Sequence, residues 1–239
     1  MTHRTPLIAL SLIATGCFAA SAHAALEGRD LDGNLSTFEA YYDTDLDITW
    51  LADANYAQTS GYNADGLMTW EEAVSWANNL EYWGYNDWRL PTTTDSGEIG
   101  CDFAYGGTDC GYNVDPASSE LAHLYHQTLG NLSFFTNTGA DSGAFEGGSD
   151  PDSTLDNVGP FINFQPGGYW SGTEFMAEPE FFAWGFGTFA GFQNGIGKSD
   201  VMYALAVRPG DVAAVPEAET YAMLLAGLGL IGWRARRRG

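Results

Sequence analysis

The chain has 239 residues, 31 of them acidic and nine basic, and its formal net charge is −22. A surface with this excess of negative charge repels nucleic acid and anionic lipid, so we expect neither as a partner. Hydrophobic residues make up 45% of the sequence, which is enough to build one domain with a core of real size.

The first 24 residues have the features of a signal peptide. A weakly basic start precedes a largely apolar stretch over 7–20 and a small-x-small site over 22–24. We therefore expect signal peptidase to cut between Ala24 and Ala25 and the remaining chain to be exported.

Residues 25–42 form a lead-in with little periodicity, and alternating apolar and polar residues over 41–51 then predict a strand. Asp43, Asp45 and Asp47 imitate the start of a calcium-binding loop. The glycine and glutamate that such a loop needs at its sixth and twelfth positions are missing. We interpret the three aspartates as a solvated strand face or turn. Calcium is the one cofactor that the sequence leaves open, and no complete motif supports it.

A helix is predicted to begin after Thr69 and to end near 78–82. Thr69 and Glu72 have the spacing of a capping box, in which the two residues satisfy each other's backbone amides. The apolar face of this helix consists of Trp70, Ala73, Val74, Ala77 and Leu80.

The segment 88–92 has the sequence Trp-Arg-Leu-Pro-Thr. Its proline restricts Leu90 to an extended conformation, so we expect a strand end or a turn. Arg89 stands between large apolar side chains, and we predict that its stem covers them while its guanidinium pairs with a carboxylate. We predict the same for Arg208. We expect this motif and the second arginine to stabilise the fold and not to bind a ligand. The residues of this structural motif are Trp88, Arg89, Leu90, Pro91 and Arg208.

Two cysteines, Cys101 and Cys110, follow the signal peptide. In an oxidising compartment, an even pair at this short spacing predicts one disulfide. Metal ligation is the alternative, but no further cysteine follows and the nearest histidines are His123 and His126.

A second helix is predicted over 119–129, and Gly130 is a natural stop. Its apolar face consists of Leu121, Leu124, Tyr125 and Leu129. Glu120, His123 and His126 lie on this helix and could hold a metal ion, but we expect them on a solvated face. We predict neither a metal site nor a catalytic residue.

After a long polar loop at 139–156, strands are expected at 169–171, 182–186 and 203–207. Helices early in the chain and strands late in it predict the α+β fold class.

Aromatic faces can stack on the apolar face of a sugar ring, and Trp170 and Trp184 are our candidates for that role. Packing in the core is the more frequent use of such residues. Carboxylates are so abundant that no catalytic pair can be singled out.

The end of the chain, over 211–239, contains Pro216-Glu217, then an apolar run over 221–233, then a basic stop. The arginines of this stop are Arg234, Arg236, Arg237 and Arg238. As a helix the run would rise about 20 Å, less than the roughly 30 Å of a hydrocarbon core, so it would be a marginal anchor. The tail resembles the PEP-CTERM sorting signal of Gram-negative bacteria. A plain C-terminal anchor is the alternative.

This resemblance implies removal of the tail by an exosortase, transient contact with the inner membrane, and a final place at the cell surface or in the extracellular matrix. Removal of both ends would leave 29 acidic and four basic residues, a net charge of −25.

Four motifs stand out between residues 43 and 210. They are Thr69-Trp70 with Glu72-Ala73, Trp88–Thr92, Tyr169–Glu174 and Ala206–Arg208. Together they resemble the domain at the C-terminus of the Legionella collagen-like adhesin. The resemblance implies a single C-type-lectin-like domain with two helices and a mainly antiparallel sheet, a fold shared with formylglycine-generating enzymes. Those enzymes need a late cysteine pair, and no cysteine follows Cys110 here, which argues against their activity.

We therefore expect an exported, non-catalytic surface or matrix protein that binds exopolysaccharide or another extracellular polymer. The alternative is a secreted hydrolase or metal-dependent enzyme on the same scaffold. That alternative requires a concave site with convergent carboxylates or a bound metal ion.

Overall fold

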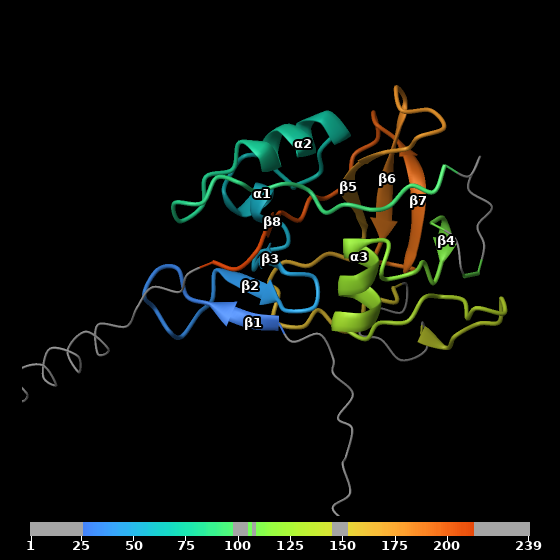
Figure 1. The fold of residues 1–239 in the computed structure, drawn as a ribbon, viewed down its shortest axis with the longest axis horizontal. Helices are drawn as coiled ribbons and strands as arrows, with labels where there is room; N and C mark the ends of the chain where they lie inside the picture. Colours follow the sequence, from blue (N-terminus) through green and yellow to red (C-terminus); the bar gives the residue numbers. More distant parts are fainter. Residues whose placement is uncertain (1–25, 98–104, 107–108, 145–152, 213–239) are drawn as a thin grey trace, which may run out of the picture.

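The computed structural model describes residues 26–97, 105–106, 109–144 and 153–212. The predicted signal peptide and sorting tail lie outside these ranges. The described strands form two four-stranded antiparallel sheets at opposite ends of the domain, and helical segments lie between and above them (Figure 1). This architecture agrees with the α+β class that the sequence predicted.

The first sheet has the strand order β1-β2-β3-β8, and the second has the order β4-β7-β6-β5. The strands of the first are β1 (Leu26–Arg29), β2 (Ala40–Asp43), β3 (Ile48–Leu51) and β8 (Val207–Pro209). Those of the second are β4 (Gly111–Tyr112), β7 (Phe192–Gly197), β6 (Phe182–Gly187) and β5 (Gly168–Glu174). The strands predicted at 169–171 and 182–186 lie in β5 and β6. The strand predicted at 203–207 gives only its last residue to β8.

The predicted lead-in is part of the fold, so the expected domain start at residue 43 is too late. Strand β1 pairs with β2 along its whole length, from Leu26 opposite Asp43 to Arg29 opposite Ala40. A strand of four residues is too short to leave an alternating signal in the sequence, and only its tertiary partner identifies it.

The single strand predicted over 41–51 is instead the hairpin of β2 and β3. The Asp43 side chain is fully buried and accepts hydrogen bonds from the amides of Asp45 (3.1 Å) and Leu46 (3.2 Å). Asp47 has a positive φ of 51°. The aspartates that imitate a calcium loop therefore build the turn of this hairpin, where short polar side chains bond to their own backbone.

The first predicted helix is confirmed as α2 (Trp70–Asn78). The Glu72 carboxylate accepts hydrogen bonds from the backbone amide and the hydroxyl of Thr69, both at 2.9 Å. A further single turn, α1 (Tyr56–Thr59), was not predicted. It is too short to show helical periodicity.

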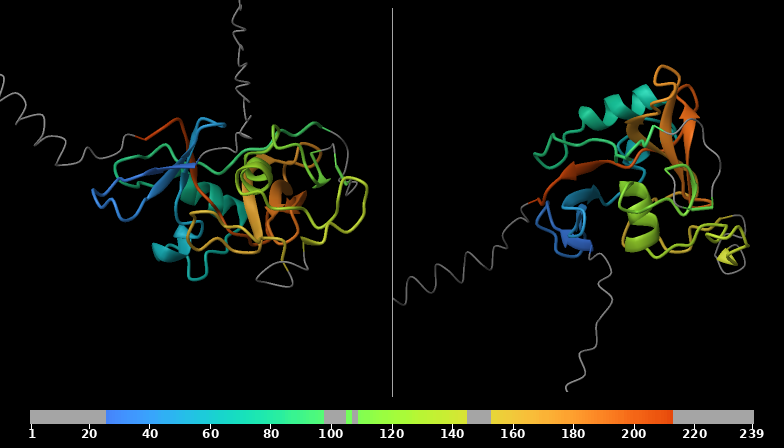
Figure 2. Two further views of the ribbon diagram at one scale, coloured as in Figure 1. Left: turned by 90° about the horizontal axis from the view of Figure 1, so that it is seen from below. Right: turned by 45° about the vertical axis from the view of Figure 1, so that its right-hand side comes forward.

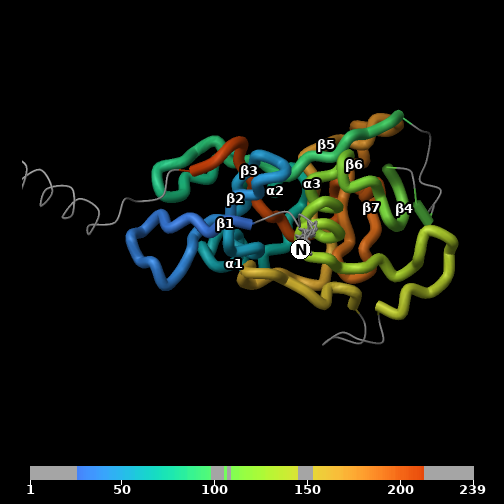
Figure 3. Tube along the Cα trace, turned by 60° about the horizontal axis from the view of Figure 1, so that its bottom comes forward, coloured from blue at the N-terminus to red at the C-terminus, as the bar shows by residue number. Residues whose placement is uncertain are grey.

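The second predicted helix is present, but it consists of α3 (Glu120–Ala122) followed by a π-helix, η1 (His123–Thr128). The Ser119 hydroxyl accepts the amide of Ala122 at 3.2 Å and caps its start, and Gly130 follows its end with a φ of 72°. In Figures 1 and 3 this helix lies between the two sheets. Five consecutive residues of it, 121–125, are buried, and the ring centroids of Tyr125 and Phe186 in β6 lie 5.3 Å apart.

The core connects the two ends of the described chain. Strand β8 returns beside β3, so N-terminal and C-terminal segments share one sheet (Figure 2). Backbone hydrogen bonds of 2.8 and 2.9 Å also join Arg89 to Val207. The largest fully buried side chains include Trp50, Trp88, Trp170 and Trp184. Among the described residues, no helix has the length and apolar character to cross a membrane.

Candidate ligand-binding pocket

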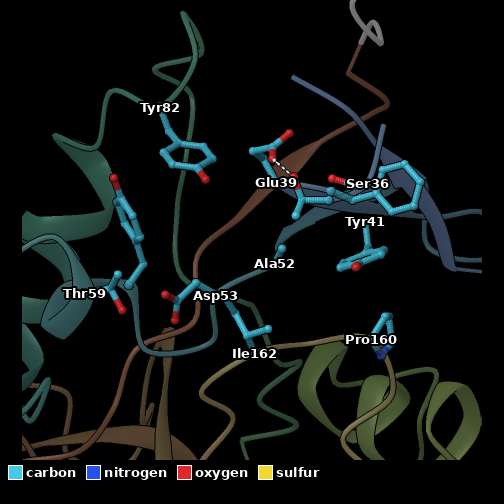
Figure 4. A pocket seen from close by; sticks show the side chains of 12 residues that line it. Ser36, Glu39, Tyr41, Ala52, Asp53, Thr59, Tyr82, Pro160 and Ile162 are labelled. Atoms are coloured by element: carbon cyan, nitrogen blue, oxygen red, sulfur yellow. Dashed lines mark hydrogen bonds between the residues drawn. The ribbon is translucent and has the colours of Figure 1, made fainter. Parts of the chain in front are cut away.

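A pocket of about 470 Å³ lies where β2, α1, the turn after α2 and the segment 160–162 meet. We call it the tyrosine pocket. Its lining residues are Ser36, Thr37, Phe38, Glu39, Tyr41, Ala52, Asp53, Tyr56, Thr59, Tyr82, Pro160 and Ile162. Figure 4 shows the ring of Tyr82 on one side and that of Tyr41 on the other, with Glu39 and Ala52 between them.

Backbone pairing fixes one side of the pocket. Ala54 donates its amide to Ile162 at 2.9 Å, and Ile162 donates its own to Ala52 at 3.0 Å. These bonds hold Asp53 in place. Its carboxylate accepts hydrogen bonds from the amide of Asn55 (2.9 Å) and the side chain of Asn163 (3.0 Å).

The loop between β1 and β2 forms the opposite wall of the pocket. Two carboxylates of this loop accept hydrogen bonds from its own backbone amides. Glu39 accepts the amide of Leu31 at 2.8 Å, and Asp30 accepts the amide of Gly33 at 2.7 Å. The Glu39 carboxylate is therefore held in one position at the pocket. A carboxylate oxygen has two lone pairs, so Glu39 and Asp53 keep capacity to accept further hydrogen bonds.

Aromatic rings line both sides of the pocket in pairs. The ring centroids of Tyr56 and Tyr82 lie 5.0 Å apart, and those of Phe38 and Tyr41 lie 6.1 Å apart. At the rim, Phe38 is 42% exposed and Ile162 is 58% exposed. The pocket thus combines accessible apolar surface with hydroxyl and carboxylate groups, the combination typical of small-molecule and sugar sites.

Two tyrosines of the pocket, Tyr82 and Tyr41, stay protonated at neutral pH. Burial raises the pKa of Tyr82 to about 12, and the nearby Tyr56, Glu39 and Asp53 shift it in the same direction. Burial, together with the charge of Glu39, also raises the pKa of Tyr41. Their hydroxyls are therefore available as donors beside two carboxylate acceptors.

Sequence reasoning missed these tyrosines. The pocket is assembled from segments that lie far apart in the chain, and each tyrosine alone resembles an ordinary half-buried residue. One usable signal was the run Tyr82-Trp83-Gly84-Tyr85, in which three aromatic residues surround a glycine.

The predicted stacking role of Trp170 and Trp184 is wrong. Trp170 is fully buried and donates its indole N–H to the carbonyl of Met68 at 2.8 Å. Trp184 is 1% exposed and donates to the carboxylate of Asp95 at 2.9 Å. Both strands are covered on the faces that carry these rings, so neither ring can meet a ligand.

The two arginines expected to pair with carboxylates both do so. Arg89 donates two hydrogen bonds to Glu120, and Arg208 donates two to Asp87, all at 2.7 to 2.8 Å. The side chains of Trp88, Leu90 and Pro91 are buried beside them.

The prediction of a solvated face for Glu120, His123 and His126 is also wrong. Glu120 is engaged by Arg89, His123 is only 6% exposed, and burial lowers the pKa of His126. The three do not form a ligand group. Within the described ranges, three carboxylates beside the pocket have oxygen atoms within 4.8 Å of one another, namely Asp30, Asp32 and Glu39.

The remaining predicted residues receive no structural test. Cys110 is buried, but Cys101 lies outside the described residues, so their disulfide stays a prediction. The processing residues Ala24, Ala25, Pro216 and Glu217 also lie outside, as do Arg234, Arg236, Arg237 and Arg238.

Comparison with known proteins identifies two regions. The model of the Lcl C-terminal domain family matches residues 39–208, and that of the PEP-CTERM protein-sorting motif matches residues 214–238. Among curated proteins, none matches the sequence.

Proposed function

The chain belongs to the Lcl C-terminal domain family and ends in a PEP-CTERM sorting motif, and from this we propose that it is a non-catalytic protein of the cell surface or extracellular matrix that binds polysaccharide in the tyrosine pocket. The sorting motif indicates export with a membrane-anchored or surface location, and it implies processing by an exosortase. The proposed binding of polysaccharide rests on the residues that line the pocket.

The observation that carries the proposal is the convergence of rings and acceptors in the tyrosine pocket. The rings of Tyr41, Tyr56 and Tyr82 offer apolar faces for the C–H groups of a sugar ring. Glu39 and Asp53 are already oriented by hydrogen bonds from the protein, so they can accept sugar hydroxyls with little loss of entropy.

A non-catalytic role is the simpler use of this arrangement. Asp53 accepts a hydrogen bond on each oxygen, from Asn55 and from Asn163, and these contacts support it as a fixed acceptor. A hydrolase would instead release new reducing ends from the polymer. Incubation of the protein with the host's exopolysaccharide, followed by a reducing-end assay, is expected to give no increase over buffer.

Further parts of the proposal rest on sequence motifs and on the family resemblance. We propose a C-type-lectin-like domain with a Cys101–Cys110 disulfide and no required cofactor. We also propose cleavage at the N-terminal signal, removal of the tail in a Gram-negative host, and a role in adhesion or biofilm. Mass spectrometry of both ends of the protein recovered from host fractions tests the two cleavages.

The binding test compares Tyr82→Ala with Phe181→Ala. Phe181 is 64% exposed but lies outside the pocket, so its variant removes an exposed ring of similar size elsewhere. Titration with the host's exopolysaccharide is expected to show roughly tenfold weaker binding for Tyr82→Ala, the effect of losing about 1.4 kcal/mol of stacking, and unchanged binding for Phe181→Ala.

Tyr82 also packs on Tyr56 and Trp88, so thermal unfolding must show that Tyr82→Ala is folded. Tyr82→Phe serves as the second variant because it keeps the ring and removes only the hydroxyl. Absence of binding by the wild-type protein, or equal loss in both alanine variants, would contradict the proposed site.

A further inference from the structure

No basic residue of the domain is available to an acidic ligand. Between the predicted processing sites the sequence contains four basic residues, and the structure places every one of them in an ion pair. The pairs are Arg29 with Glu27 and Asp211, Arg89 with Glu120, Lys198 with Glu174, and Arg208 with Asp87. None of the four lines the tyrosine pocket.

The charge of the pocket itself is negative. Glu39 and Asp53 lie in its lining, and the carboxylates of Asp30 and Asp32 are close behind Glu39. Like charges at short range destabilise a complex, whereas a cation between carboxylates gains charge-assisted hydrogen bonds of about twice the strength of neutral ones. A negatively charged sugar is therefore disfavoured here and a positively charged one is favoured.

We propose that the tyrosine pocket recognises sugar units with a free, protonated amino group, and that it discriminates against N-acylated and acidic sugars. The inference rests on the proposed function and names the ligand class of the same site. The rings of Tyr56 and Tyr82 contact the pyranose face, while Glu39 and Asp53 accept hydrogen bonds from the ammonium group.

The experiment uses two oligosaccharides that differ only in charge. A glucosamine oligomer and the matching N-acetylglucosamine oligomer have the same rings and linkages, and in mildly acidic buffer only the first is cationic. Calorimetric titration of the exported protein is expected to show roughly tenfold tighter binding of the free amine, because its hydrogen bonds to carboxylates are charge-assisted. A galacturonic acid oligomer is expected not to bind.

Three isosteric variants locate the effect. Glu39→Gln and Asp53→Asn each remove one charge from the pocket, and each is expected to reduce the preference for the free amine severalfold. Asp200→Asn removes one exposed charge outside the lining and is expected to change nothing. This control separates pocket recognition from the general attraction of a cation to an acidic protein, and thermal unfolding shows whether each variant is folded.

The outcomes distinguish the inference from the proposed function. Equal or tighter binding of the acetylated oligomer, still sensitive to Tyr82→Ala, would overturn the amine preference and leave polysaccharide binding in place. Binding of trilysine with the same dependence on Glu39 and Asp53 would overturn the recognition of a sugar. If neither oligomer nor the host's polysaccharide binds, both proposals fail together.

Discussion

Arg89 and Glu120 join two segments that are 31 residues apart in the chain, through two hydrogen bonds of 2.7 and 2.8 Å. Glu120 also accepts the amide of Thr92 at 2.6 Å. The Glu120 side chain is 16% exposed and that of Arg89 is 30% exposed. The pair is therefore shielded enough from water that the loss of one partner leaves an unbalanced charge.

We expect Glu120→Gln to lower the free energy of unfolding by about 2 kcal/mol, because an amide cannot replace a charged, two-bond partner for arginine. Urea denaturation measures the change. Glu180→Gln, at an exposed position, is the control and is expected to stay within about 0.5 kcal/mol of the wild type. Equal stability of the two variants would show that the Arg89 pair is not structural.

A change at Trp170 is expected to affect stability and not binding. Trp170→Phe removes the donor to the Met68 carbonyl and leaves a gap in a fully buried site, which together destabilise by about 2 to 4 kcal/mol. Under conditions in which the variant is folded, its affinity for polysaccharide should equal that of the wild type. Reduced affinity of the folded variant would restore Trp170 as a binding residue.

Features with a local cause could be predicted from the sequence. Neighbours within four residues determine the capping box of Thr69 and Glu72 and the helix end at Gly130. The ion pair of Arg89 could also be expected, because an arginine between apolar side chains needs a partner and carboxylates are abundant in this protein. What could not be predicted depends on tertiary neighbours. His123 is only 6% exposed, and this burial depends on tertiary packing that no local pattern predicts.

The tyrosine pocket belongs to the second kind. Its rings come from β2, α1 and the turn after α2, so no single window of sequence contains it. The tryptophans drew attention because they are rare and large, yet those properties also make them effective core residues. Half-buried tyrosines were the better candidates, since each exposes part of a ring and a hydroxyl.

Two glycines with positive φ provide a matched pair. A Cβ at Gly191 would lie 2.8 Å from the Cα of Ser133 and 2.9 Å from the ring of Tyr125, whereas a Cβ at Gly130 would meet nothing within 4 Å. We expect Gly130→Ala to destabilise the protein by about 1 kcal/mol, which is only the cost of a positive φ for a residue with a Cβ atom. Gly191→Ala should lose about 3 kcal/mol, because overpacking adds to that cost. Equal values from chemical denaturation would exclude the close contact.

The Arg208–Asp87 pair predicts a pH dependence of stability. Hydrogen bonding from Arg208 holds the pKa of Asp87 below its usual value. Because the folded-state pKa is the lower one, the contribution is complete above the unfolded-state value of about 3.9 and is lost as the pH falls through the folded-state value.

Asp87→Asn should therefore be less stable than the wild type at neutral pH, and the difference should close as the pH falls below about 4. Urea midpoints over a pH series measure it. The side chain is 47% exposed, so high salt should reduce the difference. Asp200→Asn, outside every ion pair of the described residues, should show no such trend. A difference that persists at low pH would assign the effect to packing.

Trp83 follows the pocket residue Tyr82 and has a backbone conformation that tryptophan rarely adopts. Tyr82 and Tyr85 exchange two backbone hydrogen bonds of 2.9 and 3.0 Å, and the two residues between them, Trp83 and Gly84, have φ of 49° and 84°. Positive φ at both central residues is the feature of a type I′ turn, and the first of these residues is most often asparagine or glycine. Trp83 is nevertheless 53% exposed, with its ring 6.4 Å from that of Tyr82.

A bulky residue in this position is strained, and such strain is concentrated at functional sites. We expect Trp83→Asn to keep or slightly raise the unfolding temperature, because asparagine suits the turn, and to weaken polysaccharide binding severalfold, because the ring that extends the Tyr82 surface is gone. Trp83→Tyr keeps a ring in the same place and should retain most of the affinity. If Trp83→Asn loses stability and keeps full affinity, the ring serves packing and the binding surface ends at Tyr82.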